Sequence, residues 1–213
     1  MTVSAETESS ALIVVDVQVD FCPGGSLAVA DGEAVVPVIN RLASRFGTVV
    51  ATRDWHPEGH GSFASSHPGK NPFERGRLGG IDQMLWPDHC IQGSAGAEFH
   101  PKLDVRPVRV VLHKGFRADL DSYSAFFEND HTTSTGLEYL LKGLGFQRLY
   151  FCGIATDVCV LFSVIDALRL GFECVLVEDG CRGVDRPAGS VDSAIGRMKD
   201  GGCLVIRSDE VVR

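Results

Sequence analysis

In RLYFCGIATDVC, residues 148–159, an apolar run of strand length passes directly into the start of a helix. Arg148 to Ile154 is too continuously apolar for a strand with one solvent-facing side, and it is typical of a strand buried on both faces. Thr156 is a good helix N-cap, and helical periodicity continues from Thr156 to Leu170. A buried strand followed by a helix is the unit from which helix-covered parallel sheets are built.

The same alternation recurs on both sides of this stretch. The further apolar runs of strand length are Ala11 to Val17, Thr48 to Thr52, Val108 to His113, Cys174 to Val177 and Cys203 to Ile206. The further segments with helical periodicity are Glu33 to Phe46, Thr135 to Leu144 and Pro187 to Lys199. We therefore predict an α/β fold of three layers, α/β/α, with a central, mainly parallel six-stranded sheet whose strand order the sequence does not reveal.

Length and composition suit one globular domain over residues 1–213, with 44% apolar and 23% charged residues. Disorder is expected only at the ends, over residues 1–10 in particular. The formal net charge of -8 and the lack of any Lys/Arg run argue against nucleic acid or an anionic membrane, so we expect a small-molecule partner. No secretory signal pattern or membrane-length apolar stretch is present, which favours a cytoplasmic location with reduced cysteines. A homo-oligomer is one option that the sequence leaves open.

Cys159 falls in the first turn of the helix that follows residues 148–154. The helix dipole and free backbone N–H groups at that position would favour the reactive thiolate and could hold an oxyanion. The alternative is that Cys159 packs as a small hydrophobe, as free cysteines commonly do. Cys152, Cys174 and Cys203 lie within apolar strands and are interpreted as core residues.

Two charged residues stand at the ends of other predicted strands. Asp16 follows Ile13-Val14-Val15, and Lys114 follows Val110 to His113. Because the carboxyl ends of parallel strands meet at one edge, Asp16, Lys114 and Cys159 should converge there. Together they suit acyl transfer, with Asp16 as the base and Lys114 as the cation that stabilises the thiolate and keeps the base ionised. Taken singly, Asp16 could cap a helix and Lys114 could reach solvent.

The segment from Arg53 to Arg106 is too long and too poor in periodicity to be a passive connection, and such segments are usually functional. Asp54 and His56 have the i, i+2 spacing that allows both side chains to bind one divalent ion. His89 is the best third ligand, and His60 is a second candidate. Mixed oxygen and nitrogen ligands suit zinc, iron(II) or manganese. Histidines in a loop that are merely exposed or hydrogen-bonded are the alternative.

Several separated motifs resemble one known family, the nicotinamidases or pyrazinamidases of the isochorismatase-like hydrolase superfamily. The matching stretches are VDVQVDF (15–21), TRDWHP (52–57), HGSF (60–63), WPDHC (86–90), HKG (113–115) and GIATDVC (153–159). The resemblance extends from about Ala11 to about Asp209. It implies the isochorismatase-like hydrolase fold and hydrolysis of the linear amide bond of nicotinamide, and of pyrazinamide, to release ammonia and feed NAD salvage.

The resemblance also implies roles for particular residues. It implies a catalytic triad of Asp16, Lys114 and Cys159 that acts through a thioester. It implies a metal ion, zinc before iron or manganese, held by Asp54, His56 and His89, whereas His60 is a ligand in some relatives only. It further implies a cis peptide bond before Ala155 and an oxyanion hole from the backbone N–H groups of Ala155 and Cys159. Phe21, Trp86 and Tyr123 should line the substrate pocket, with core packing as the alternative for each.

Two other functions are compatible with parts of this pattern. The first is a hydrolase on the same fold that acts on a ureido acid, a carbamoyl compound or isochorismate. The second is a metal-carrying binding protein without turnover. The combination of Cys159 with the Asp54, His56 and His89 set favours nicotinamide hydrolysis over both, because isochorismatases lack the cysteine, several amidase relatives lack the metal ligands, and a binding module needs no activated thiol.

Overall fold

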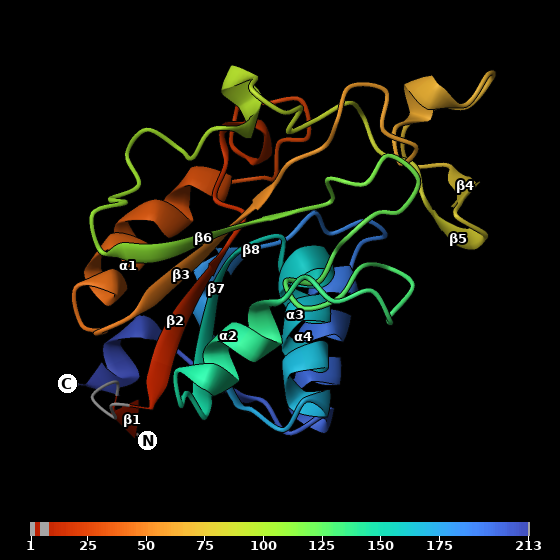
Figure 1. The fold of residues 1–213 in the computed structure, drawn as a ribbon. Helices are drawn as coiled ribbons and strands as arrows, with labels where there is room; N and C mark the ends of the chain where they lie inside the picture. The colour runs from red at the N-terminus through yellow and green to blue at the C-terminus, as the bar shows by residue number, and fades with distance from the viewer. Residues whose placement is uncertain (1–2, 5–8, 213) are drawn as a thin grey trace.

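A computed structural model describes residues 3–4 and 9–212, and its centre is a six-stranded, all-parallel sheet (Figure 1). The strands lie in the order β6-β3-β2-β7-β8-β9. Their bounds are β2 Ser10–Val15, β3 Val49–Asp54, β6 Val108–Lys114, β7 Arg148–Ile154, β8 Glu173–Arg182 and β9 Leu204–Ile206. The predicted α/β fold with a mainly parallel six-stranded sheet is confirmed.

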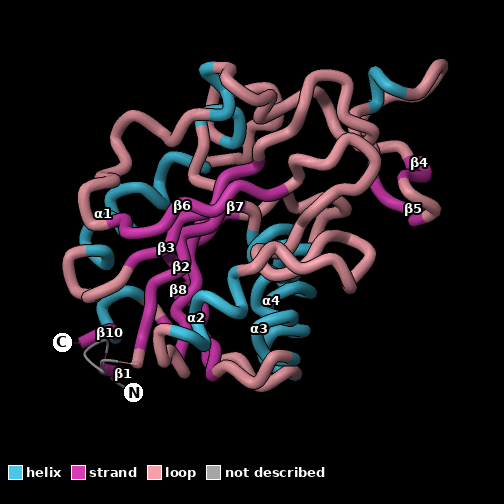
Figure 2. Tube along the Cα trace, viewed as in Figure 1, coloured by secondary structure: helices cyan, strands magenta, loops and turns pink. Residues whose placement is uncertain are grey.

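Helices cover both faces of the sheet, as Figure 2 shows. Helix α1 (Val35–Ala43) lies on one face against β7 and β8. Helices α2 (Leu137–Gly143), α3 (Leu161–Arg169) and α4 (Ser190–Asp200) lie on the other, where α3 packs on β8 and α4 on β9. This coverage explains why β2 is buried along its whole length and β7 is buried beyond Arg148, since strands between two helical layers have no solvent-facing side.

Two element boundaries differ from the predicted ones for identifiable reasons. Strand β8 continues to Arg182, although its apolar run ends at Val177, because a register shift between Phe151 and Gly153 of β7 allows pairing to resume at Cys181. The predicted helix from Thr156 begins as a π-helical turn, Thr156–Val160, and becomes α-helical only at Leu161. Such turns are rare, and they often occur at functional sites.

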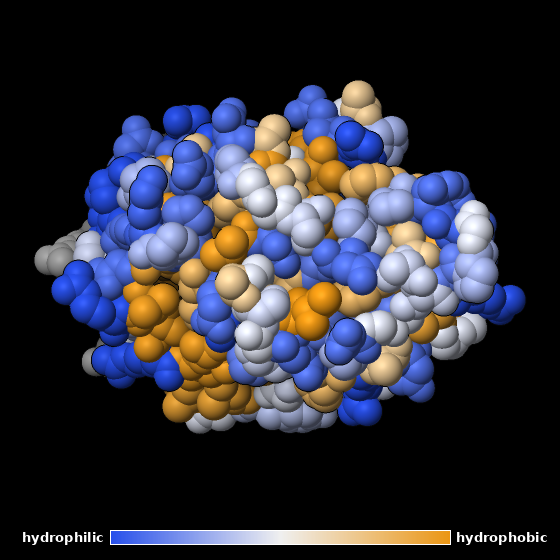
Figure 3. Space-filling model, turned by 90° about the horizontal axis from the view of Figure 1, so that it is seen from above, coloured by the Kyte–Doolittle hydropathy of each residue, from blue (hydrophilic) through white to orange (hydrophobic). Residues whose placement is uncertain are grey.

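The parallel register brings the carboxyl ends of the central strands to one edge. Asp54 of β3 is paired with Lys114 of β6, and Val15 of β2 is paired with Gly153 of β7. The long connections after β3 and β6 lie above this edge in Figure 1, where the hairpin of β4 (Arg75–Leu78) and β5 (Ile81–Met84) projects to one side. Seen from above, this face is mainly hydrophilic, with apolar side chains gathered in separate patches (Figure 3).

The chain ends lie at the opposite side, where the short strand β1 (Val3–Ser4) pairs with β10 (Val211–Val212). Of the ten N-terminal residues predicted to be disordered, residues 3–4 belong to β1 and Ser10 begins β2. Residues 1–2 and 5–8 lie outside the described part of the chain. Among the described residues, no helix has the length and apolar character needed to cross a membrane.

Candidate active site

Three side chains from separate strand ends meet at the carboxyl edge of the sheet. Lys114, the last residue of β6, is fully buried, and its Nζ lies 2.9 Å from Asp16 Oδ2 and 3.5 Å from Cys159 Sγ. Asp16 directly follows β2, and Cys159 lies in the π-helical turn after β7. The structure therefore brings together the carboxylate, the amine and the thiol that the sequence placed at separate strand ends.

Local backbone features hold this group in place. Asp16 has a φ of 47°, its N–H donates to Thr52 Oγ1 at 3.2 Å, and the Thr52 hydroxyl donates to Asp16 Oδ1 at 2.5 Å. Gly153 has a φ of 125°, and a Cβ there would lie 2.0 Å from the Val15 carbonyl oxygen. Glycine is therefore required for β7 to approach β2 closely enough to place Cys159 beside Asp16.

Burial and neighbouring charges shift the pKa values of Lys114 and of the two carboxyl groups beside it in different ways. Lys114 Nζ contacts a second carboxylate, Asp54 Oδ1, at 2.5 Å, and donates to the Ser122 carbonyl at 2.9 Å. Burial would lower the pKa of Lys114, but Asp16 and Asp54 hold that pKa well above its ordinary value. Burial would raise the pKa of Asp54, but Lys114 holds it well below the ordinary value. In contrast, burial raises the pKa of Asp16, and Lys114 offsets this only in part. Asp16 is therefore the carboxyl group best suited to exchange a proton.

The protonation state of the Cys159 thiol differs from the prediction. Burial raises the thiol pKa well above its ordinary value, and Lys114 lowers it by less, while Asp16 and Asp54 raise it further. The prediction that the helix-terminal position favours a thiolate is wrong for the resting site. Desolvation and two nearby carboxylates outweigh the lysine. The thiol consequently needs a base to accept its proton.

The backbone before Cys159 forms one wall of the adjoining cavity. The peptide bond between Ile154 and Ala155 is cis, so the geometry implied by the family resemblance is confirmed. The Ala155 carbonyl accepts hydrogen bonds from the N–H groups of Val158 and Val160, at 3.1 and 3.0 Å. Ala155 and Cys159 both line the cavity. The two residues predicted to form the oxyanion hole therefore border the same space.

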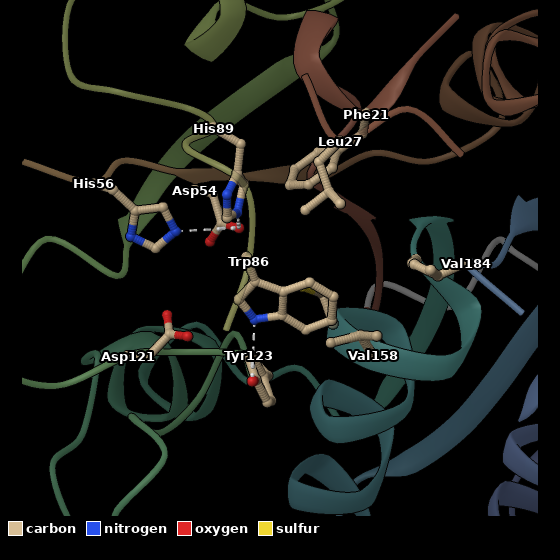
Figure 4. A pocket seen from close by; sticks show the side chains of 12 residues that line it. Phe21, Leu27, Asp54, His56, Trp86, His89, Asp121, Tyr123, Val158 and Val184 are labelled. Carbon is tan, nitrogen blue, oxygen red and sulfur yellow. Dashed lines mark hydrogen bonds and ion pairs between the residues drawn. The ribbon is translucent and has the colours of Figure 1, made fainter. Parts of the chain in front are cut away.

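A carboxylate and two imidazoles form a second group beside the first. Asp54 Oδ2 lies 3.7 Å from Nε2 of both His56 and His89, and one ligand atom from each residue lies within 4.8 Å of the others. Nδ1 of His56 is 2.7 Å from the Gly115 carbonyl, and Nδ1 of His89 is 2.8 Å from the Pro87 carbonyl. If each Nδ1 carries the proton donated to that carbonyl, each Nε2 presents a lone pair towards Asp54 (Figure 4). This donor set fits a divalent ion such as zinc.

Buried polar contacts fix the backbone that carries this second group. The Gln18 side chain binds both backbone groups of Asp54: its Oε1 accepts from the N–H and its Nε2 donates to the carbonyl, each at 2.8 Å. Gly115 has a φ of 64°, and a Cβ there would lie 2.5 Å from Cε1 of His56. A side chain at position 115 would therefore displace the His56 ring.

His60 lies next to His56 but faces other partners. The two ring centroids are 4.4 Å apart. The ring nitrogens of His60 lie 2.7 Å from Ser62 Oγ and 2.7 Å from the Arg117 carbonyl. Candidate ligand atoms of His56, His60 and Asp121 also lie within 4.8 Å of one another. In this conformation His60 supports the surrounding loops, and its nitrogens are engaged away from Asp54.

A cavity adjoins both groups (Figure 4). Phe21, Trp86 and Tyr123 line it together with the apolar side chains of Leu27, Val158 and Val184, while Asp54, His56, His89, Asp121 and Cys159 supply its polar part. The Trp86 indole N–H donates to the Tyr123 hydroxyl at 3.2 Å, and the two rings meet edge to face. The cavity therefore has aromatic walls, with a thiol and a candidate metal group at its polar part.

Sequence reasoning missed several residues of the site. Thr52 and Gln18 bind its backbone and carboxylates, and Asp121 and Val184 line the cavity. Gln18 could have been found, because it stands two residues after Asp16 at the same strand end. Asp121 and Val184 had no such signal, since both lie in irregular connections.

Comparison with known proteins places these features in one family. The isochorismatase domain model matches residues 10–210. A nicotinamidase of Acinetobacter baylyi is 45% identical over 207 residues, which is 97% of this chain and 96% of the relative. The solved structure of a nicotinamidase and pyrazinamidase of Acinetobacter baumanii is 49% identical, covers 97% of this chain and 100% of its own, and superposes with a TM-score of 0.94.

Two further solved structures contain small ligands. A protein of L. infantum in complex with nicotinate is 40% identical with a TM-score of 0.87, and the match covers 100% of this chain and 99% of that one. A pyrazinamidase of Pyrococcus horikoshii in complex with zinc is 35% identical with a TM-score of 0.76, and the match covers 93% of this chain and 99% of that one. An aromatic acid and a divalent metal ion are thus bound by structural relatives of this chain.

Proposed function

The chain belongs to the isochorismatase family, and we propose that within this family it hydrolyses nicotinamide to nicotinate and ammonia. One observation carries the proposal: the thiol of Cys159, which lies beside the buried Lys114, lines an aromatic-walled cavity together with an Asp/His/His group. A hydrolase of unrelated substrates would have no need for all of these features in one space.

The cavity suits a small planar aromatic amide. The rings of Phe21, Trp86 and Tyr123 offer apolar surfaces to a pyridine or pyrazine ring. The polar end, with Cys159, would receive the carboxamide. Pyrazinamide, which differs from nicotinamide in its ring nitrogens, is the expected second substrate.

In the first half of the proposed reaction, Cys159 Sγ attacks the carboxamide carbon, and Asp16 accepts the thiol proton. The raised thiol pKa makes this proton transfer necessary. The C–S bond forms, and the negative charge on the carbonyl oxygen would be held by the backbone N–H groups of Ala155 and Cys159. When the C–N bond breaks, Asp16 returns the proton to the leaving nitrogen, and ammonia and a thioester result.

In the second half, water attacks the thioester carbon while Asp16 accepts one of its protons. The C–S bond breaks, the thiol regains a proton, and nicotinate leaves. Lys114 stabilises the thiolate whenever it forms, and it remains charged while Asp16 holds a proton because Asp54 also raises its pKa. Nicotinate is a precursor for pyridine nucleotides, so the reaction would serve NAD salvage.

A divalent ion completes the proposed site. Asp54, His56 and His89 would hold it, with zinc as the first choice and iron or manganese as the others. When bound, the ion would polarise the ring nitrogen or orient the substrate. The zinc-containing relative supports this assignment, and so do the carbonyl contacts that leave each Nε2 facing Asp54.

A substrate panel tests the proposal. Purified protein would be incubated with nicotinamide, pyrazinamide, an N-carbamoyl amino acid and isochorismate, and ammonia or product would be measured. We expect ammonia from nicotinamide and from pyrazinamide. Turnover of the carbamoyl compound or isochorismate without turnover of nicotinamide would overturn the assignment and favour another hydrolase of this family. Failure of all four would favour a binding protein.

A further inference from the structure

Asp20 is joined to two separate segments of the cavity wall, although it does not line the cavity. It lies in the short turn Val19–Phe21 after β2. Its Oδ2 accepts a hydrogen bond from the Cys90 N–H at 2.7 Å, and its Oδ1 accepts from the Ser26 N–H at 3.2 Å. Its own carbonyl accepts from the Leu27 N–H at 3.0 Å. One residue therefore connects the loop of residues 22–27 with the segment that ends at Cys90.

Both segments carry residues of the proposed site. Cys90 directly follows His89, and its carbonyl accepts a hydrogen bond from the His56 N–H at 3.0 Å. Cys90 itself has a φ of 47°, a conformation that few side chains adopt without support. On the other side, Phe21 follows Asp20 and contacts the His89 ring edge to face, at 5.5 Å between centroids. Through the Cys90 backbone, Asp20 is linked to His89, which precedes Cys90, and to His56, which bonds the Cys90 carbonyl. Through its own backbone, Asp20 is linked to the cavity residues Phe21 and Leu27.

Two glycines provide the space that Asp20 occupies. A Cβ at Gly96 would lie 2.1 Å from Asp20 Oδ2, and a Cβ at Gly25 would lie 2.4 Å from the Asp20 backbone. Both distances are far shorter than any van der Waals contact. Gly96 therefore leaves room for the Asp20 carboxylate, and Gly25 leaves room for the Asp20 backbone.

We propose that Asp20 is a positioning residue that fixes His89 and Cys90 relative to Phe21 and Leu27, so that the metal group and the aromatic wall form together. It acts through the backbone of Cys90 and touches neither substrate nor metal. The inference deepens the proposed function and rests on it for the substrate. The metal part of the inference can be tested without any substrate.

The test compares Asp20→Asn with Asp130→Asn. The amide introduced by Asp20→Asn would keep one acceptor oxygen where the two backbone N–H groups need two. Asp130 is a matched control, because its carboxylate also accepts from two backbone N–H groups, those of Thr132 and Thr133, and Asp130 does not line the cavity. Zinc affinity would be measured by competition with a chromophoric chelator, and kcat and KM for nicotinamide would be measured at saturating zinc.

We expect Asp20→Asn to weaken zinc binding by about 10- to 100-fold, as loss of a group that orients metal ligands does, and to raise KM more than it lowers kcat. Asp130→Asn should leave zinc affinity and KM unchanged. Unchanged zinc affinity in Asp20→Asn overturns the proposal, whatever its thermal stability. If the protein does not hydrolyse nicotinamide at all, the zinc measurement still decides the positioning role.

A second variant keeps the proposal testable if Asp20→Asn does not fold. Gly96→Ala retains Asp20 and pushes its carboxylate away from Cys90, since the added Cβ would otherwise overlap Oδ2. We expect Gly96→Ala to weaken zinc binding in the same direction. Wild-type zinc affinity in a folded Gly96→Ala protein would overturn the proposal.

Discussion

The two halves of the site are held by different kinds of structure. Asp16, Lys114 and Cys159 stand at or just after the ends of β2, β6 and β7, where the sheet register fixes their backbone. His56 and His89 lie in the irregular connection after β3, where isolated bridges and side-chain contacts from Gln18 and Asp20 hold the chain. Asp54 belongs to both halves, because one oxygen contacts Lys114 and the other faces the two histidines.

We expect the strand-end residues to carry out the chemistry and the loop residues to bind the metal ion and the substrate. The strand-end half cannot rearrange without disturbing the buried sheet, which suits atoms that must meet within hydrogen-bonding distance. The loop half depends on a small number of contacts that substitutions can remove while the sheet remains intact. We therefore expect substitutions in the first half to lower kcat with little effect on metal affinity, and substitutions in the second half to change metal affinity or KM.

The largest effect should come from the nucleophile. Cys159→Ala should lower ammonia release from nicotinamide by at least about 10⁴-fold, because the proposed acyl intermediate would form on the thiol that this change removes. Cys152→Ala is the control, since that thiol is buried within β7. Zinc content should match wild type in both proteins. Substantial turnover by Cys159→Ala would contradict the proposal that Cys159 is the nucleophile.

Asp16→Asn should follow, with a loss of about 10²- to 10⁴-fold in kcat through removal of the base. The pH profile sharpens this prediction. Burial raises the pKa of Asp16, and a base must be deprotonated to act, so activity should disappear on the acid side at a higher pH than an ordinary carboxyl group would require. The kcat/KM profile of the wild type measures this limb. An acid limb at or below the ordinary carboxyl range would contradict the assignment.

His89→Ala tests the loop half alone. It removes one imidazole from the group with Asp54 and His56, so zinc affinity should fall by more than the 10- to 100-fold typical of losing an indirect supporting group. The exposed His131 provides the control variant, His131→Ala. Equilibrium dialysis with zinc measures both. Wild-type affinity in His89→Ala would exclude it as a ligand.

The smallest effect should come from Tyr123→Phe, which removes the acceptor of the Trp86 indole N–H. A hydrogen bond of this kind contributes about 0.5 to 1.5 kcal/mol, so KM for nicotinamide should rise by about 2- to 10-fold with kcat nearly unchanged. Tyr139→Phe is the control, because the Tyr139 side chain on α2 is 70% exposed. Equal KM values in the two variants would remove Tyr123 from substrate recognition.

The same division explains how much the sequence could predict. Six apolar runs and the helical segments between them were enough to predict the parallel sheet. The places of Asp16, Lys114 and Cys159 near strand ends were enough to predict that they meet at one edge. The i, i+2 spacing of Asp54 and His56 was enough to predict that both could bind one metal ion. His89 lies 33 residues beyond His56 along an irregular path, so its position depends on contacts such as those with the Pro87 carbonyl and between Cys90 and Asp20, which no periodicity reveals.

The protonation state of Cys159 was out of reach for a related reason. Its position in the first helical turn is a local property, and it pointed to a lowered thiol pKa. The actual direction is set by burial and by Asp16 and Asp54, which arrive from other strands. The strength of a distant carboxylate or of desolvation is a property of the assembled site, whereas the helix dipole can be inferred from neighbouring residues alone.

Competition between hydroxylamine and water for the acyl group shows whether Cys159 acts as a covalent catalyst. Hydroxylamine added during nicotinamide turnover competes with water for a thioester and yields nicotinohydroxamate. If Cys159 carries the acyl group, hydroxamate forms at the expense of nicotinate as the hydroxylamine concentration increases, and neither product forms in Cys159→Ala. Steady ammonia release with nicotinate as the sole product at every hydroxylamine concentration would contradict it and indicate direct attack by water.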